Sequence, residues 1–434
     1  MRILRKPHPV AMFAAWFLVV FNILFPKGGF KAGSIPLTWG FLFIVGSSAP
    51  LLLYRFLALP LRSRSTACLA LLCTLPMQAV YLYVGYAFGL ADPGFGIANV
   101  INFLVLPWLF LLVYPPFFKM IDGQRLQSYF CWSILLAAVW GIFLFFLHPI
   151  TGHYIEIPFL TVNAGDYGLL EATKNNQRGL FPKLISTYNN GNIYGVATLI
   201  ILPLFERLEA KPWKRNVVKL ALILTLSRTV WLGLVLYEAG PVLLHALQQV
   251  RTFPKIFIRS VMGRVVVVVA TGVLIVAALL FNGSKLNFLL DSSGGGRAGM
   301  FDLLFTADLL PSNGMQGFNE TVYSSVAHLY GFLGLGAFVL MMGSPLILLL
   351  VDRSAMRSVP RRAALKGLML YMVLVGIDGC INYVPVMIFY WFVYMVYACG
   401  WPGESDGRYV PAAFEIPVRK RWFRRIPPLP RPAV

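Results

Sequence analysis

Long apolar runs recur along the whole chain, and they constrain the fold more than any other feature. Several runs approach the roughly 20 residues that a helix needs to cross a bilayer. Of the 434 residues, 58% are hydrophobic and 12% are charged, about half the charged fraction of a soluble domain. The sequence therefore predicts an all-α, polytopic transmembrane bundle.

The apolar pattern predicts about twelve helices. Their expected ranges are 8–25, 37–54, 66–90, 96–117, 129–148, 193–206, 213–227, 229–249, 265–281, 326–350, 367–378 and 385–402. The first range resembles a signal peptide in charge and length, but no small-residue cleavage site follows directly, so we expect an uncleaved helix. Residues 1–402 would form the membrane domain. Residues 403–434 would form a basic, Pro-rich tail that binds anionic lipid or a partner protein.

The distribution of Lys and Arg predicts the orientation. With the N-terminus inside, 29 of the 37 Lys and Arg residues lie on the cytoplasmic side and 8 on the opposite side. Positive residues stay inside during insertion, so both termini are expected in the cytoplasm. The net charge of +20 then reports orientation, and we expect no nucleic-acid partner.

Arg228 interrupts the apolar stretch "LALILTLSRTVWLGLV" at residues 220–235. An arginine at the bilayer centre costs about 2.5 kcal/mol or more. A single helix over 216–239 would also reverse the orientation of every later segment, against the charge rule. We therefore expect two helices with a turn near Ser227–Arg228. The short first helix would leave Arg228 recessed in a polar pocket.

Two long connections fall on the non-cytoplasmic side, at 149–192 and 282–325. Both mix Gly, Asn and Pro with aromatic residues and a few charges. Long ordered loops on a rigid scaffold are usual places for binding and chemistry. We expect the two loops to form a periplasmic cap.

Three arginines, Arg178, Arg228 and Arg297, lie on the same side, against the positive-inside trend. The planar guanidinium donates two parallel hydrogen bonds to a phosphate. Three such groups from separate segments could converge on a pyrophosphate. The alternative is that each is a surface or ion-paired arginine.

Acidic and imidazole groups on this side are candidates for a general base. Glu320 ends the second long loop and His328 lies near the start of the following helix. Further carboxylates are Asp302, Asp308 and Asp378. Separately, Glu238 and His245 lie seven residues apart on one helix and could form a buried polar pair.

Several classes of site have no signature in this sequence. The five cysteines lie in or beside apolar segments and show no metal-ligand spacing, so we predict no metal. There is no P-loop and no dinucleotide-binding fingerprint, so we expect no cofactor and no use of ATP by this chain.

The motif "LSRTVWLGL" around Arg228 resembles the Ser-Arg signature between two helices of the O-antigen ligase and polysaccharide polymerase superfamily. The upstream "RGLFPKLISTYNNGNIYGVATLIILP" and the downstream "GGGRAGMFDLLFTADLLPSNGMQGF" are similar to the two large loops of that family. "HLYGFLGLGAFVL" is similar to its Gly-rich helix. The resemblance covers about 170–345.

The resemblance implies an integral-membrane glycosyltransferase of the bacterial inner membrane. Its donors would be glycans on undecaprenyl pyrophosphate at the periplasmic face. By position, Arg178, Arg228 and Arg297 would bind the donor pyrophosphate. Glu320 and His328 remain alternatives for the general base.

Two branches of the superfamily can be compared. Ligases carry His-Asn about ten residues before the Gly-rich helix; counting back from Gly331, this chain has Asn319, Glu320 and Thr321 there. This departure favours the polymerase, and the general pattern resembles an exopolysaccharide enzyme of the xanthan type. An O-antigen ligase that transfers glycan to lipid A core remains the alternative.

Other classes also fit parts of the pattern. A flippase for the same lipid-linked glycans would match the helices and buried charge, although transporters usually show pseudo-symmetric halves. A non-catalytic scaffold is the third class. The partners implied are the lipid-linked glycans, membrane lipids, and a polysaccharide co-polymerase and flippase.

Overall fold

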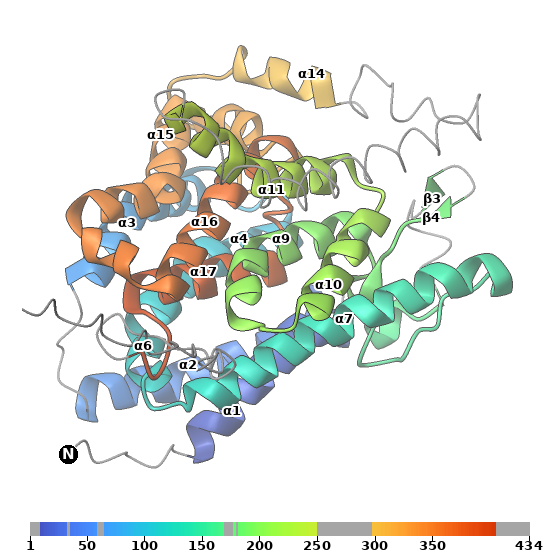
Figure 1. Cartoon of the computed structure of the whole chain (residues 1–434). Coiled ribbons are helices and arrows are strands. Elements are labelled where there is room, and N and C mark those ends of the chain that lie inside the picture. Colours follow the sequence, from blue (N-terminus) through green and yellow to red (C-terminus); the bar gives the residue numbers. More distant parts are fainter. Residues whose placement is uncertain are drawn as a thin grey trace, which may run out of the picture.

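The computed structural model describes residues 9–32, 35–58, 65–168, 177–178, 181–249 and 297–404. Most of these residues are helical, and the described strands form two short antiparallel hairpins, β1–β2 and β3–β4. The helices pack against one another as a bundle (Figure 1). The expected helical class is confirmed.

The elements follow one another in this order. The first half contains α1 (Pro9–Val19), π-helix η1 (Val20–Leu24), β1 (Gly29–Ala32), β2 (Ile35–Thr38), α2 (Trp39–Ala58), α3 (Ser65–Phe88), α4 (Pro93–Val100), η2 (Ile101–Val105), α5 (Leu106–Trp108), η3 (Leu109–Val113), α6 (Tyr114–Phe118) and α7 (Gly123–Thr151). The middle contains η4 (Ala164–Asp166), β3 (Gln177–Arg178), β4 (Phe181–Pro182), η5 (Ser186–Tyr188), α9 (Gly191–Leu208), α10 (Pro212–Leu224) and α11 (Arg228–Gln249). The last part contains α14 (Arg297–Phe301), η6 (Asp302–Leu304), α15 (Val322–Val351), η7 (Arg353–Arg357), α16 (Val359–Asp378) and α17 (Val384–Cys399).

The apolar helices suggest a multi-pass membrane protein. Within the described part of the chain, five helices are long and apolar enough to cross a membrane: Thr66–Phe88, Gly94–Phe118, Gly123–Thr151, Gly191–Leu208 and Val322–Val351. Three shorter apolar helices accompany them: Pro9–Leu24, Trp39–Tyr54 and Val384–Cys399.

The expected count of twelve spanning helices is not supported. Within the described residues a helix occupies each expected range, but several are too short or too polar to meet the same criterion. Helix α10 has only 13 residues, and α16 carries Arg361 and Arg362 in its first turn. The expected range 265–281 lies outside the described residues.

The connections between helices gather at two ends of the bundle, which we name after an arginine at each. At the Arg228 end, Leu184 N–H donates to the Leu224 carbonyl and Gly379 N–H to the Glu320 carbonyl. At the Arg361 end, the Trp401 indole donates to the Gly123 carbonyl. The helices therefore run between two opposed sets of loops.

Helix α9 forms the centre of the bundle. Nearly all of its residues are buried, and α16 and α17 pack on it (Figure 1). Its first half contains the small residues Gly195, Ala197 and Thr198, which allow neighbouring helices to approach closely. A Cβ on Gly195 would lie 2.1 Å from Val230 Cγ2, so glycine is required where α11 crosses α9. This contact positions the start of α11.

The expected division of the stretch around Arg228 is confirmed. Helix α10 ends at Leu224 and α11 begins at Arg228. The turn between them includes Leu226 at φ 50°. Thirteen residues of α10 extend about 20 Å, which is shorter than the roughly 30 Å hydrocarbon core of a bilayer. The short helix agrees with a recessed position for Arg228.

Helix α15 is broken at Gly331, although the apolar pattern predicted one continuous helix. Gly331 has φ 68° and ψ 179°. The N–H groups of Phe332 and Leu333 donate to the carbonyls of Asp308 and Leu309. A Cβ on Gly331 would lie 2.7 Å from the Leu309 carbonyl oxygen, so this loop contact requires glycine.

The expected cap formed jointly by two loops is not seen in the described residues. The first loop pairs with the N-terminal hairpin: Gly29 bridges to Asn163, and Lys31 Nζ lies 2.5 Å from Asp166 Oδ1. The second loop pairs instead with the α3–α4 connection, where Leu90 bridges to Met315.

The two loops pair with different segments, instead of with each other, for a physical reason. The last residues of the first loop, 183–189, are buried within the bundle. The second loop donates and accepts its hydrogen bonds along the side of α15 and at the 379–383 turn. Each loop therefore satisfies its backbone polar groups against a different neighbour. Residues 169–176, 179–180, 282–296 and 405–434 lie outside the described residues.

Candidate functional site

Arg228 is the first residue of α11 and is partly buried. Its neighbours Ser227, Thr229 and Val230 are buried. In the described part of the chain, its guanidinium has no hydrogen-bond or ion-pair partner. A partly buried guanidinium without a partner is costly, since its donors lose water and gain nothing. The position therefore favours an anionic ligand.

The backbone around Arg228 adds to this preference. The first N–H groups of a helix have no acceptor within the helix, and the helix dipole is positive at that end. Helix α9 also starts here, where the Asn190 side chain accepts from the N–H groups of Asn192 and Ile193. Two helix N-termini and an arginine therefore lie at the same end of the bundle.

Asp378 is a buried carboxylate at the same end. It is the last residue of α16 and is 3% exposed. The Asn192 amide donates to its Oδ2 at 2.8 Å, and the Cys380 thiol donates to its Oδ1 at 3.2 Å. A carboxylate at a helix C-terminus opposes the helix dipole. These two donors compensate for that unfavourable location.

Asn192 connects Asp378 to the turn before Arg228. A Cβ on the preceding Gly191 would lie 3.2 Å from the carbonyl oxygen of Thr225. The start of α9 thus packs on the α10–α11 turn on one side and bonds to α16 on the other. The Oδ1 atom of Asn192 is buried and has no hydrogen-bond partner in the described structure.

The turn at 379–383 carries backbone strain beside Asp378. Cys380 has φ 47°, an unusual value for a residue with a side chain. The Tyr371 hydroxyl donates to the Gly379 carbonyl at 2.7 Å. Asn382 forms two hydrogen bonds with the backbone of Phe318, at 2.6 and 2.9 Å. Strained, well-held turns of this kind occur at functional sites.

Tyr383 ends this turn and meets a cation. The Lys27 ammonium lies 5.1 Å from the centre of the Tyr383 ring, within the range of a cation–π contact. Burial raises the pKa of Tyr383, and the electrostatic effect of the neighbouring acidic groups Cys380, Asp378 and Glu320 adds to the rise. Tyr383 therefore stays a neutral hydrogen-bonding group at ordinary pH.

The two candidate bases lie in different surroundings. The Glu320 carbonyl bonds to Gly379, and its side chain is exposed. His328 is partly buried, its carbonyl accepts from Asn313, and its Nδ1 atom is buried without a hydrogen-bond partner in the described structure. Glu320 thus belongs to the Asp378 neighbourhood, whereas His328 lies beside the second loop.

The other two predicted arginines have only their backbone described. Arg178 lies on β3 and pairs with Phe181, and Arg297 begins α14. In Figure 1 this hairpin and α14 occupy separate parts of the picture. The side chains of Arg178 and Arg297 lie outside the described residues, so their convergence with Arg228 stays a prediction.

A separate charged cluster lies between α9, α10 and α11. Lys219 Nζ is 2.6 Å from Glu206 Oε1 and 2.5 Å from Glu238 Oε1, and the Tyr237 hydroxyl donates to Glu206. Glu238 therefore has Lys219 as a partner, which the sequence pattern did not indicate. The side chain of His245, the expected partner, lies outside the described residues.

Sequence reasoning missed four residues of the Arg228 end: Lys27, Asn192, Cys380 and Tyr383. Their contacts join segments far apart in the chain, and no local motif marks them. Asp378 was noted only as one carboxylate among several. The one available signal was its place in the last turn of an apolar segment.

Chemically, the Arg228 end offers a donor fork, a fixed carboxylate and a neutral phenol near a lysine. The guanidinium and the ammonium of this set suit an anionic group that gains negative charge during a reaction, whereas the carboxylate suits a proton acceptor. No protein-family model matches the chain, and comparison with curated protein sequences gives no match.

Proposed function

We propose that this protein is a membrane glycosyltransferase that polymerises oligosaccharide repeat units carried on undecaprenyl pyrophosphate. It would act at the periplasmic face of the bacterial inner membrane, with both termini in the cytoplasm. The observation that carries the proposal is Arg228, a partly buried guanidinium without a partner among the described residues. Its motif resembles that of the polysaccharide polymerases.

The reaction would use these groups as follows. A hydroxyl of the lipid-linked acceptor attacks the anomeric carbon of the donor glycan, and its proton passes to a base. A new glycosidic bond forms while the bond from the anomeric carbon to the pyrophosphate oxygen breaks. Arg228 would stabilise the charge on the leaving undecaprenyl pyrophosphate, with Arg178 and Arg297 as further proposed contacts.

The base is proposed among three groups. Glu320 and His328 are the candidates from the sequence. Asp378 joins them because its carboxylate is buried and held by Asn192 and Cys380. The same hydrogen bonds would also suit a positioning role, in which Asp378 orients Asn192 toward the acceptor. Measuring kcat and KM separately after substitution of each group distinguishes a base from a positioning residue.

A purified-protein assay tests the proposal. The full chain is reconstituted in lipid nanodiscs with a radiolabelled undecaprenyl-pyrophosphate oligosaccharide. We expect products that are longer by whole repeat units, and loss of these products in Arg228→Ala. The control is Arg125→Ala, because the Arg125 side chain is 65% exposed and belongs to the Arg361 end. Absence of elongation by the folded wild type would refute the proposal.

A flippase for the same lipids is the second candidate, and one observation favours it. The cluster of Glu206, Lys219 and Glu238 places two carboxylates and one ammonium inside the helical bundle. Ionisable groups within spanning segments commonly mark proton or ion pathways. Translocation of the labelled lipid across proteoliposomes, without bond formation, would support this candidate over the polymerase.

A further inference from the structure

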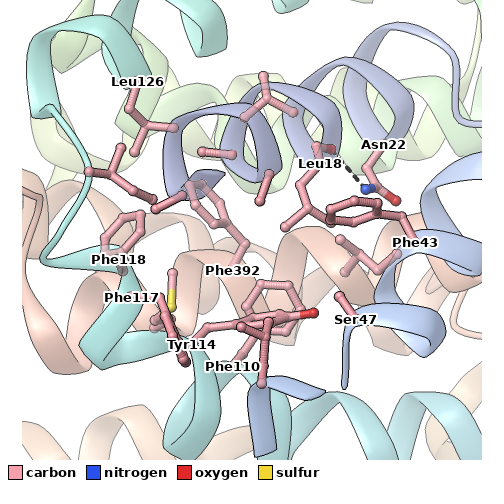
Figure 2. A pocket seen from close by; sticks show the side chains of 18 of the residues that line it. Leu18, Asn22, Phe43, Ser47, Phe110, Tyr114, Phe117, Phe118, Leu126 and Phe392 are labelled. Atoms are coloured by element: carbon pink, nitrogen blue, oxygen red, sulfur yellow. Dashed lines mark hydrogen bonds between the residues drawn. The ribbon is translucent and has the colours of Figure 1, made fainter. Parts of the chain in front are cut away.

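An apolar crevice of about 360 Å³ runs along α1. Its walls come from α1, η1, α2, the η3–α6 region, the start of α7 and α17 (Figure 2). It extends from Val10 to Ile23, a length of about 20 Å at the rise of a helix. This length exceeds half of the roughly 30 Å hydrocarbon core of a bilayer.

The lining of the crevice is suited to hydrocarbon. It contains no charged residue, and its polar side chains are few. The Asn22 amide donates to the Leu18 carbonyl at 2.8 Å (Figure 2), and the Ser47 hydroxyl donates to the Ile44 carbonyl at 3.3 Å. These polar groups therefore bond within their own helices, and the walls offer a ligand mainly apolar contact.

One end of the crevice leads to the Arg228 end. Ile388 and Phe389 of α17 line the crevice, and α17 begins one residue after Tyr383. On the opposite wall, η1 ends at Leu24, three residues before Lys27. Since Lys27 lies over the Tyr383 ring, a lysine and a phenol lie beyond this end of the apolar walls.

The other end of the crevice is open. Val10 is 67% exposed and Tyr54 is 46% exposed. A chain longer than the crevice could therefore continue past these residues into the surrounding lipid. The arrangement has a cation at one end and an apolar exit at the other, which matches a long hydrocarbon chain with an anionic head group.

We propose that this crevice binds the isoprenoid chain of a polyprenyl pyrophosphate. The head group would lie near Lys27 and Tyr383, on the side of the bundle that holds Arg228. This inference rests on the proposed function, because it assigns the tail of the same lipid-linked substrate. It commits to the isoprenoid chain; a bulk phospholipid acyl chain is the outcome that opposes it.

Photo-crosslinking tests the crevice without requiring turnover. Purified full-length protein in nanodiscs is labelled with a benzophenone-bearing polyprenyl pyrophosphate, and the labelled peptides are mapped by mass spectrometry. We expect label on α1 and α17. Unlabelled undecaprenyl pyrophosphate should compete, whereas excess phosphatidylglycerol should not. Equal competition by phosphatidylglycerol would overturn the proposal.

Two substitutions fill the crevice from different walls. Ala14→Phe acts on α1 and Ser47→Leu on α2, both at partly buried positions. Each should lower labelling at least about tenfold, as expected when about two methylene groups lose their burial. The matched control is Gly336→Phe on α15, where a Cβ meets no atom within 4 Å and the residue is exposed.

The outcomes separate the two proposals. Labelling that is unchanged in both crevice variants, or equally reduced in Gly336→Phe, would overturn the crevice assignment. If Ala14→Phe fails to fold, Ser47→Leu decides by itself. Absence of glycan elongation by the wild type would defeat the proposed polymerase activity, whereas specific labelling of the crevice in that same protein would still show a polyprenyl-binding site.

Discussion

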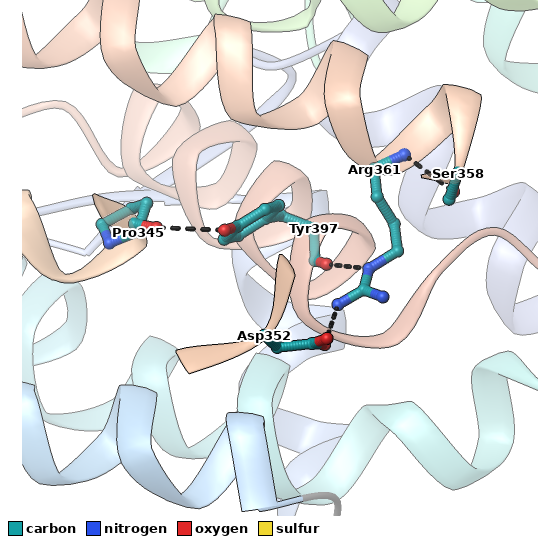
Figure 3. Close-up of polar contacts among 5 residues, drawn as sticks. All are labelled: Pro345, Asp352, Ser358, Arg361 and Tyr397. Carbon is teal, nitrogen blue, oxygen red and sulfur yellow. Dashed lines mark hydrogen bonds and ion pairs between the residues drawn. The ribbon is translucent and has the colours of Figure 1, made fainter. Parts of the chain in front are cut away.

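Two arginines at opposite ends of the bundle differ in what surrounds them. Arg361 is 8% exposed, and its guanidinium donates to the Tyr397 carbonyl at 2.6 Å and to Asp352 at 2.9 Å (Figure 3). The backbone N–H of Arg361 also donates to the Ser358 hydroxyl, which caps α16. Arg228 is partly buried and has no such partner among the described residues.

The contrast separates a structural arginine from a candidate ligand-binding one. Arg361 joins the end of α15 to the end of α17, so its charge and donors are satisfied within the protein. A buried polar group that the fold leaves unsatisfied needs another explanation. For Arg228 the explanation offered here is an anionic substrate. Substitutions at the two positions should therefore affect different properties.

The largest effect is expected for Arg228→Ala. Elongation should fall by about 10²–10³, the usual cost of removing one donor to a developing negative charge. The folded protein loses no hydrogen bond in the described structure, so its thermal stability in detergent should hold. Elongation assays and thermal unfolding of the same sample measure both. Full-length polymer from this variant would remove the distinction between the two arginines.

Arg361→Ala should have the opposite effect, on stability. The change removes the hydrogen bonds that Arg361 donates to Asp352 and to the Tyr397 carbonyl. Removing one partner of a buried ion pair costs about 3–5 kcal/mol; because Asp352 is 26% exposed, we expect about 2–3 kcal/mol. Thermal unfolding and membrane protein levels should fall. A loss of activity per folded molecule, with stability intact, would contradict the structural role.

Lysine at each position sharpens the comparison. Arg228→Lys keeps the charge but loses the planar fork, so elongation should still fall by more than about tenfold. A lysine side chain at position 361 can keep only one of the two partners of the guanidinium, Asp352 or the Tyr397 carbonyl. We therefore expect the free energy of unfolding to fall by about 1–2 kcal/mol. The same pair of assays applies. Wild-type elongation by Arg228→Lys would show that a point charge is sufficient.

The smallest effect is expected for Asp352→Asn. The amide oxygen can still accept from Arg361, which also keeps the Tyr397 carbonyl. The free energy of unfolding should fall by about 0.5–1 kcal/mol, as for partly exposed ion pairs, and this decrease should shrink as salt is added. Unfolding measured at low and high salt checks this. A loss as large as that of Arg361→Ala would mean that the ion pair dominates the contact.

Much of the helical organisation was predictable because it depends on local composition. Apolar runs marked the helices, and the charge rule marked the turn before Arg228. The break at Gly331 was missed, because an apolar run does not reveal which loop will reach it. The count of twelve spans and the joint cap failed for a related reason. Length, burial and loop pairing depend on neighbouring helices.

The sequence by itself determined that the chain folds into apolar helices and that an arginine stands at a turn within an apolar stretch. Only the tertiary structure decided which arginine is satisfied and which carboxylate is held at the Arg228 end of the bundle. The Asn192–Asp378 hydrogen bond joins residues 186 positions apart, and the Lys27–Tyr383 contact joins residues 356 positions apart. Helical periodicity reports only neighbours within a turn or two, whereas the partner of a buried polar group is chosen by packing.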